Sequence, residues 1–160
     1  MPIRPSTPAD HEAIWAILEP VFSAGESYAI DPDISREDAL EYWLGTDRES
    51  FVFEQDGAVL GTYYLRTNAG GGGSHVCNCG YITAPAAAGR GIARRMCLHS
   101  LDQARTRGYR AMQFNFVVAT NTRAIDLWET LGFATVGTLP GAFNHPRHGM
   151  VDALVMYQSL

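Results

Sequence analysis

The sequence has few cysteines, no long apolar run and no excess of positive charge. Its 160 residues include 3 cysteines, and 12 Lys and Arg stand against 17 Asp and Glu. The net charge of −5 argues against a nucleic-acid-binding protein, whose affinity depends on Lys and Arg that neutralise phosphates. No apolar run approaches the roughly 20 residues that span a bilayer, and residues 1–5 are too polar for a signal peptide. The sequence therefore predicts a cytoplasmic protein that binds neither nucleic acid nor a membrane.

The cysteines favour neither a disulfide nor a metal site. Cys77 and Cys79 are two residues apart in a predicted strand, so both thiols point to the same face and are poorly placed to bond each other. With Cys97 the number is odd, and the five histidines add no spacing typical of a zinc site. We expect reduced, partly buried thiols and no bound metal.

The length and the 46% hydrophobic content predict one globular domain over residues 1–160. Helix signals begin near Thr7 and at Ser35, and an Asp-Gly turn separates two strands of a hairpin. The expected element order is β-α-α-β-β-β-α-β-α-β-β, which predicts a mixed α/β sheet with one strand-loop-helix crossover at its centre. The last two strands are expected at residues 133–138 and 151–157.

The strongest chemical signal lies between the strand ending at residue 83 and the helix that follows. Gly89 and Gly91 allow close approach of a ligand to the backbone, and the helix behind them presents unpaired N–H groups and the positive end of its dipole. Arg90, Arg94 and Arg95 add positive charge, so the segment predicts a small pyrophosphate site. Two glycines before a helix can also be only a tight turn, and neither a P-loop nor a Rossmann motif is present.

A second motif gives this loop a context. The segment 88–93 (Ala-Gly-Arg-Gly-Ile-Ala) is similar to the pyrophosphate loop of the GNAT superfamily of acyl-CoA-dependent N-acetyltransferases. Residues 121–133 resemble the Asn-x-x-Ala-x-x-x-Tyr-x-x-x-Gly-Phe helix of that superfamily, and the likeness covers nearly the whole chain. It implies a GNAT fold, with splayed middle strands flanked by helices, and acetyl-CoA as co-substrate.

The resemblance also implies a set of coenzyme-binding residues. These are Gly80, Tyr81, Ile82, Gly89, Arg90, Gly91, Ile92, Ala93, Arg94 and Asn121. A backbone N–H near Tyr81 would also stabilise the oxyanion of the transferring acetyl group. Two positions depart from the family pattern: Ala88 stands where Arg or Gln is usual, and Trp128 replaces a Tyr that many members use as general acid. An indole N–H does not ionise usefully, so that proton donor is missing.

Three asparagines resemble those of a group within the superfamily that acetylates proline analogues in yeast. By that likeness Asn78 anchors the substrate carboxylate, Asn115 lies beside the reacting amine and Asn121 contacts the coenzyme. The alternative is that Asn78 and Asn115 only fix the backbone of the diverging strands. Amides in otherwise apolar strands must find partners, which favours a functional role.

Three further candidates lie in loops. Glu26 could relay a proton from the acceptor ammonium through water, or it could be simply solvated. Tyr28, two residues later, could shape the acceptor pocket. His145, in the expected final hairpin loop, has a pKa range suited to a base, but it could equally be a turn residue.

The sequence therefore predicts a GNAT-type N-acetyltransferase that transfers acetyl from acetyl-CoA to a small primary or secondary amine, with amino acids among the acceptors. Transfer would be by direct attack in a ternary complex, and a homodimer is one expected assembly. One alternative is a non-catalytic acyl-CoA-binding regulatory module, because Trp128 replaces the usual general acid. The other is a protein N-acetyltransferase, which is disfavoured if Asn78 anchors a substrate carboxylate.

Overall fold

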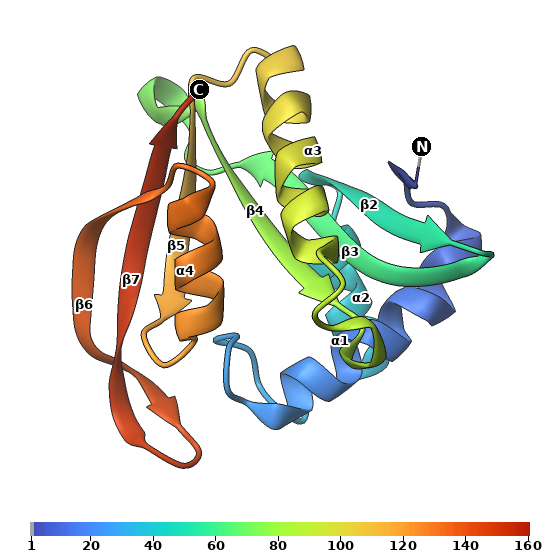
Figure 1. Ribbon diagram of the computed structural model, residues 1–160, viewed down its shortest axis with the longest axis horizontal. Helices are drawn as coiled ribbons and strands as arrows, with labels where there is room; N and C mark the ends of the chain where they lie inside the picture. Colours follow the sequence, from blue (N-terminus) through green and yellow to red (C-terminus); the bar gives the residue numbers. More distant parts are fainter. Residues whose placement is uncertain (1) are drawn as a thin grey trace.

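The computed structural model describes residues 2–160, in which seven strands form one sheet of order β1-β2-β3-β4-β5-β7-β6 (Figure 1). The strands are β1 Ile3–Pro5, β2 Arg48–Gln55, β3 Ala58–Thr67, β4 Val76–Thr83, β5 Ala111–Val118, β6 Ala134–His145 and β7 Gly149–Ser159. The helices are α1 His11–Ala24, α2 Arg36–Leu44, α3 Ile92–Thr106 and α4 Thr122–Thr130. The expected element order and the mixed α/β architecture are confirmed.

Helices cover both faces of the sheet and bury a core on each. In Figure 1, α3 and α4 lie in front of the sheet and α1 and α2 behind it. The front core joins Met96 and Leu101 of α3 to Cys77, Cys79 and other buried strand residues. The rear core joins α1 and α2 to the opposite side chains of the same strands. Because strand side chains alternate between faces, β2, β3 and β4 contribute to both cores.

Local signals set several element boundaries. The Ser35 hydroxyl accepts a hydrogen bond from the Asp38 N–H at 3.1 Å and so caps α2. Asp56 and Gly57 both have positive φ, at 53° and 79°, which matches a type I′ turn between β2 and β3. None of the helices formed by residues 2–160 is long and apolar enough to cross a membrane.

The two central strands separate soon after they begin. The parallel pair β4 and β5 is in register only at Val76 with Ala111 and Cys77 with Met112. Figure 1 shows the two strands leaving this common end and diverging, with α4 beside one and α3 beside the other. Pairing of β5 with β7 is irregular between Phe114 and Val117, which bends β5 beside the opening.

The final hairpin is longer than expected. Strands β6 and β7 extend the predicted ranges because an irregularity between Leu139 and Phe143 lets pairing resume beyond it. The Asp152 carboxylate accepts a hydrogen bond from the Gly141 N–H at 2.9 Å and holds this irregularity. His145, expected in the loop, is therefore the last residue of β6, opposite Gly149.

Candidate active site

The gap between β4 and β5 exposes backbone groups of alternate β4 residues. The Ala84 N–H donates to the Leu60 carbonyl beside β3 at 2.8 Å. Because hydrogen-bonded pairs recur at every second residue of an antiparallel ladder, the backbone groups of Ile82 and Gly80 also bond to β3. Tyr81 faces the other way, and its carbonyl accepts a hydrogen bond from the Tyr28 hydroxyl at 3.1 Å. The backbone groups of Gly80 and Ile82 therefore bond to β3, whereas the Tyr81 N–H faces the gap.

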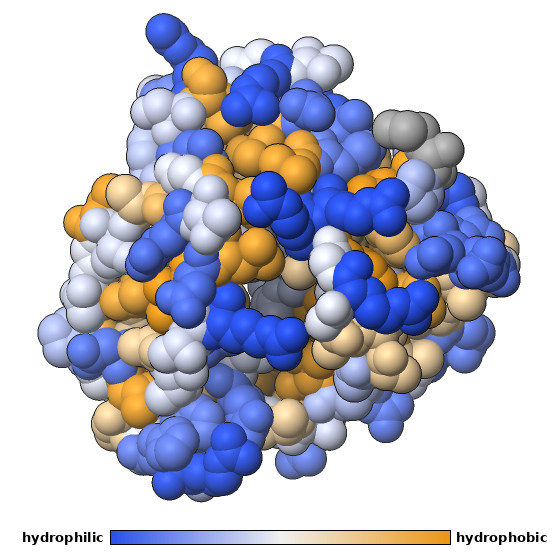
Figure 2. All heavy atoms as spheres, in the orientation of Figure 1, coloured by the Kyte–Doolittle hydropathy of each residue, from blue (hydrophilic) through white to orange (hydrophobic). Residues whose placement is uncertain are grey.

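On the front face, a cavity of about 460 Å³ lies beside the loop that precedes α3; we call it the glycine-loop cavity. Gly89 and Gly91 line it with φ values of 79° and 75°, a left-handed conformation that favours glycine. Ile92 and Ala93 follow at the start of α3, where backbone N–H groups lack helical partners. Figure 2 shows this face hollowed near its centre.

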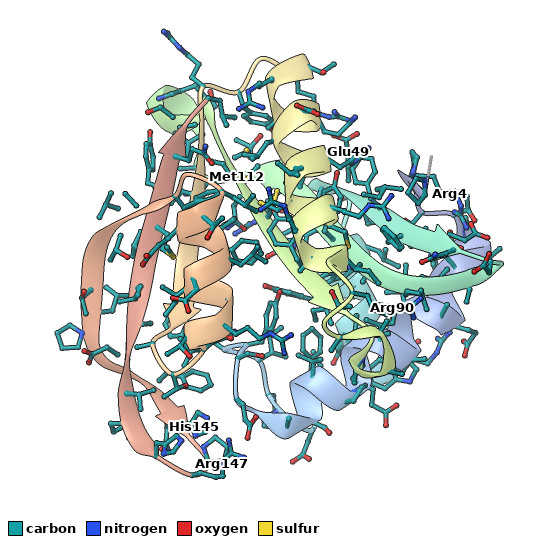
Figure 3. All side chains as sticks on the ribbon, viewed as in Figure 1. Arg4, Glu49, Arg90, Met112, His145 and Arg147 are labelled. Carbon is teal, nitrogen blue, oxygen red and sulfur yellow. The ribbon has the colours of Figure 1, made fainter. Side chains whose placement is uncertain are left out.

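Two arginines give the glycine-loop cavity its charge. Arg94 of α3 and Arg123 of α4 line it, whereas Arg90 is exposed in the loop and does not (Figure 3). Arg95 turns away and places its guanidinium 4.9 Å from the centre of the Phe53 ring. Arg123 was missed by the sequence reasoning, because only the fold brings the start of α4 to this loop. The left-handed glycines, the helix N-terminus and two guanidinium groups fit a pyrophosphate.

On the rear face, a cavity of about 450 Å³ is lined by four tyrosines; we call it the tyrosine cavity. Its tyrosines are Tyr28, Tyr42, Tyr64 and Tyr81. Burial raises the pKa of Tyr28 and of Tyr64 far above the usual range, so both hydroxyls stay protonated at neutral pH. They can donate or accept hydrogen bonds there, but they cannot serve as bases.

The two cavities share a wall at the gap between the strands. Tyr81, Thr83, Asn121, Ala124 and Trp128 line both. The Trp128 ring lies 5.1 Å from the rings of Tyr81 and Phe114, so it packs where many family members have Tyr. The Tyr81 hydroxyl lies 2.7 Å from the Ser100 hydroxyl, so the Tyr81 side chain is held in the front core while its backbone N–H faces the gap.

A chain of side-chain amides crosses the gap beneath the tyrosine cavity. The Asn78 side-chain amide donates to the Gln113 backbone carbonyl at 2.9 Å, and the Gln113 side-chain amide donates to the Asn115 oxygen at 2.9 Å. The Asn115 amide in turn donates to the Asn68 oxygen at 2.7 Å. Asn78 and Asn115 both line the cavity, and each NH₂ group has a second hydrogen for a ligand. Asn121 lies above them, where its oxygen caps α4 through the Ala124 N–H at 3.4 Å.

The rim of the site joins two distant loops. Glu26, between α1 and α2, forms an ion pair of 2.9 Å with Arg147 in the turn between β6 and β7. Neither residue lines a cavity, although Ser27 and Tyr28 beside Glu26 do. His145 is buried, its Nδ1 accepts a hydrogen bond from the Arg147 N–H at 3.1 Å, and it also lies outside both linings (Figure 3). The strand carries its side chain into the hairpin, and its assignment to the substrate pocket stays a prediction.

The buried thiols are chemically quiet. Burial raises the pKa of Cys77 and of Cys97 to about 12, and that of Cys79 well above its usual value. Because the thiolate is the nucleophile, none of the three is suited to carry an acyl group. Within residues 2–160, no group of three or more His, Cys, Asp or Glu is placed to hold a metal ion.

The sheet parts between two cavities, and one of them is built on a left-handed glycine loop at a helix start. Residues 11–133 match the model of the Acetyltransferase (GNAT) family, and the chain belongs to that family. It is a GNAT N-acetyltransferase.

Two relatives and one further structure with the same fold resemble the chain. A GCN5-related N-acetyltransferase structure from Kribbella flavida is 42% identical, with a TM-score of 0.93 over 99% of this chain and 96% of that one. The N-acetyltransferase aca1 of Schizosaccharomyces pombe is 29% identical over an alignment of 148 residues, which covers 82% of this chain and 71% of the relative. A phosphinothricin acetyltransferase from Sinorhizobium meliloti, solved with acetyl-CoA, is 20% identical and shares the fold with a TM-score of 0.85, over 99% of this chain and 87% of that one.

Proposed function

We propose that this protein transfers an acetyl group from acetyl-CoA to the amine of a small molecule, with amino acids as the acceptor class. One observation carries the proposal: two cavities of similar volume share a wall at the gap that the Tyr81 N–H faces. A donor in the glycine-loop cavity and an acceptor in the tyrosine cavity can therefore meet without a covalent enzyme intermediate. Holding both reactants in one cleft supplies much of the acceleration.

The residues of the shared wall have distinct proposed roles. Bound acetyl-CoA supplies the activated thioester. Gly89, Gly91, Arg94 and Arg123 hold the pyrophosphate, and Asn121 lies where the arm of the coenzyme enters the gap. The Tyr81 N–H donates to the thioester oxygen and stabilises the charge that develops there. Trp128 excludes water from the gap without supplying a proton.

The acceptor ammonium must lose a proton before it attacks, and the lining offers no base. In the part of the chain that the structure describes, no Asp, Glu or His lines the tyrosine cavity. Burial raises the pKa values of Tyr28, Tyr64 and Tyr81, which excludes these three hydroxyls as bases. Glu26 lies at the rim beside lining residues, and we propose that it receives the proton through water. Asn115 would orient the amine, while Asn78 and Tyr28 hold the body of the acceptor.

Glu26 can be tested against its own ion-pair partner. A general base contributes about 10²- to 10⁴-fold to the rate, so Glu26→Gln should lower kcat/KM by at least about 10²-fold. Arg147→Gln breaks the same ion pair but leaves the carboxylate in place, and it should cost far less. Equal small losses of kcat/KM in the two variants would show that Glu26 only forms the ion pair at the rim and is not the base.

The function itself is tested by steady-state kinetics with a panel of amino acids, other small amines and peptides. Released CoA thiol is measured while both substrates are varied. Direct transfer predicts intersecting double-reciprocal plots and turnover with at least one small amine. Parallel plots would contradict direct attack. Turnover restricted to peptides would indicate a protein acetyltransferase, and the ion pair that joins the rim loops argues against so large an acceptor.

A further inference from the structure

Two arginines lie directly opposite each other beside the tyrosine cavity. Arg48 of β2 and Arg66 of β3 are register partners in the antiparallel pair. Like charges at such positions are destabilising. Asp47 contacts both arginines: its carboxylate lies 2.9 Å from Arg48 Nε but 3.9 Å from Arg66 Nη1. The cluster therefore carries a net positive charge, and its shared carboxylate is bound closely to Arg48.

The two guanidinium groups differ in their access to the cavity. The Arg48 side chain is 9% exposed and stacks over the rings of Tyr42 and Tyr64, at 5.1 and 4.8 Å from their centres. Arg66 is 29% exposed and lines the cavity itself. Among residues 2–160, Arg66 is the only charged residue on that lining. An acceptor in the tyrosine cavity therefore meets one cation and no acid.

Arg66 is also held in place toward the site. Its Nε donates to the Asn78 oxygen at 3.4 Å, and the Tyr64 hydroxyl approaches the same oxygen at 3.5 Å. Arginine has five N–H donors in a planar fork that matches a carboxylate. With Nε directed to Asn78, the terminal nitrogens are left for a second partner beyond the loose contact with Asp47.

We infer that Arg66 binds the carboxylate of the acceptor, so that the substrate is an amine that also carries an acid group, an amino acid. This inference rests on the proposed function. Asn78 then acts both on the acceptor and by orienting Arg66. Polyamines and lysine-rich peptides are disfavoured, because they would bring a second positive charge against an unneutralised guanidinium.

The experiment compares each amino acid of the panel with its own carboxamide, which keeps the amine and removes the charge. Losing a hydrogen bond to a charged group corresponds to roughly 10- to 200-fold in kcat/KM, so the wild-type protein should prefer the acid by that factor. Arg66→Gln should remove the preference by raising KM for the acid and leaving the amide nearly unchanged. Arg66→Lys should retain part of it. Arg110→Gln is the matched control, because Arg110 is exposed and lines neither cavity.

The possible results distinguish a failure of the Arg66 assignment from a failure of the proposed acetyl transfer. A wild-type ratio near one overturns the inference even if Arg66→Gln does not fold, because the ratio needs no variant. Equal losses for acid and amide in a folded Arg66→Gln also overturn it. Absence of turnover with every acceptor, while acetyl-CoA still binds, would overturn the proposed function itself and the inference with it.

Discussion

Replacing Gly80 with alanine tests how β4 shapes the acceptor site. A Cβ at this position would lie 2.5 Å from Cε2 of Tyr64 and 2.9 Å from its Cζ. The ring is 5% exposed and has little room to move, because the Trp43 ring lies 4.9 Å from it and the Arg48 guanidinium 4.8 Å. Gly80 is thus the position at which the strand backbone makes room for the tyrosine that lines the cavity.

The expected magnitude follows from overpacking, which costs about 1–3 kcal/mol. Unfolding entropy is about 2.1 cal/mol/K per residue, or ~0.34 kcal/mol/K for 160 residues. Gly80→Ala should therefore lower Tm by about 3–9 °C. It should also raise KM for the acceptor more than for acetyl-CoA, because Tyr64 lines only the tyrosine cavity.

The matched control is Gly137→Ala in β6, where an added Cβ has no neighbour within 4 Å. Differential scanning fluorimetry should show little change in its Tm. If the two variants have the same Tm and the same acceptor KM, Tyr64 moves freely and the account of the tyrosine cavity is wrong.

Three further predictions concern the coenzyme loop, the shared wall and pH. Acetyl-CoA should raise Tm by mass action, and Gly91→Asp should abolish this shift, because it places a carboxylate at the pyrophosphate position and strains a φ of 75°; an undiminished shift would remove the loop from the coenzyme site. Trp128→Phe should retain substantial turnover with some loss of stability, and a loss of about 10³-fold with intact coenzyme binding would show that the indole takes part in the chemistry. Burial lowers the pKa of His99, whose Nδ1 lies 2.7 Å from the Tyr63 hydroxyl, so the fold favours the neutral ring. The stabilisation that neutral His99 provides should be fully present above about pH 6.5, and the free energy of unfolding should fall as the pH drops toward the lower folded-state pKa. Denaturant titrations should show a smaller fall for His99→Gln than for the wild-type protein. Equal falls in the two proteins would contradict this assignment.

Local patterns in the sequence were sufficient for most of the fold. Helix caps such as Ser35 and the turn at Asp56 and Gly57 depend on neighbours in the chain, so their signals are legible without a tertiary structure. The final hairpin was predicted too short, because its continuation depends on Asp152 binding the Gly141 N–H across 11 residues. The burial of His145 follows from that extension.

Alone, the sequence determined the family, and it predicted the coenzyme loop and the strand that carries Tyr81. The signals for all three lie in short contiguous motifs, because a left-handed loop and a helix start require particular residues at fixed spacing. The tertiary structure decided which backbone groups face the gap, since β3 takes those of Gly80 and Ile82 and leaves Tyr81. It also brought Arg66 to the tyrosine cavity and Arg123 to the glycine loop. No local pattern marks those two arginines, because a charge becomes part of a site only when strands and helices distant in the chain close around it.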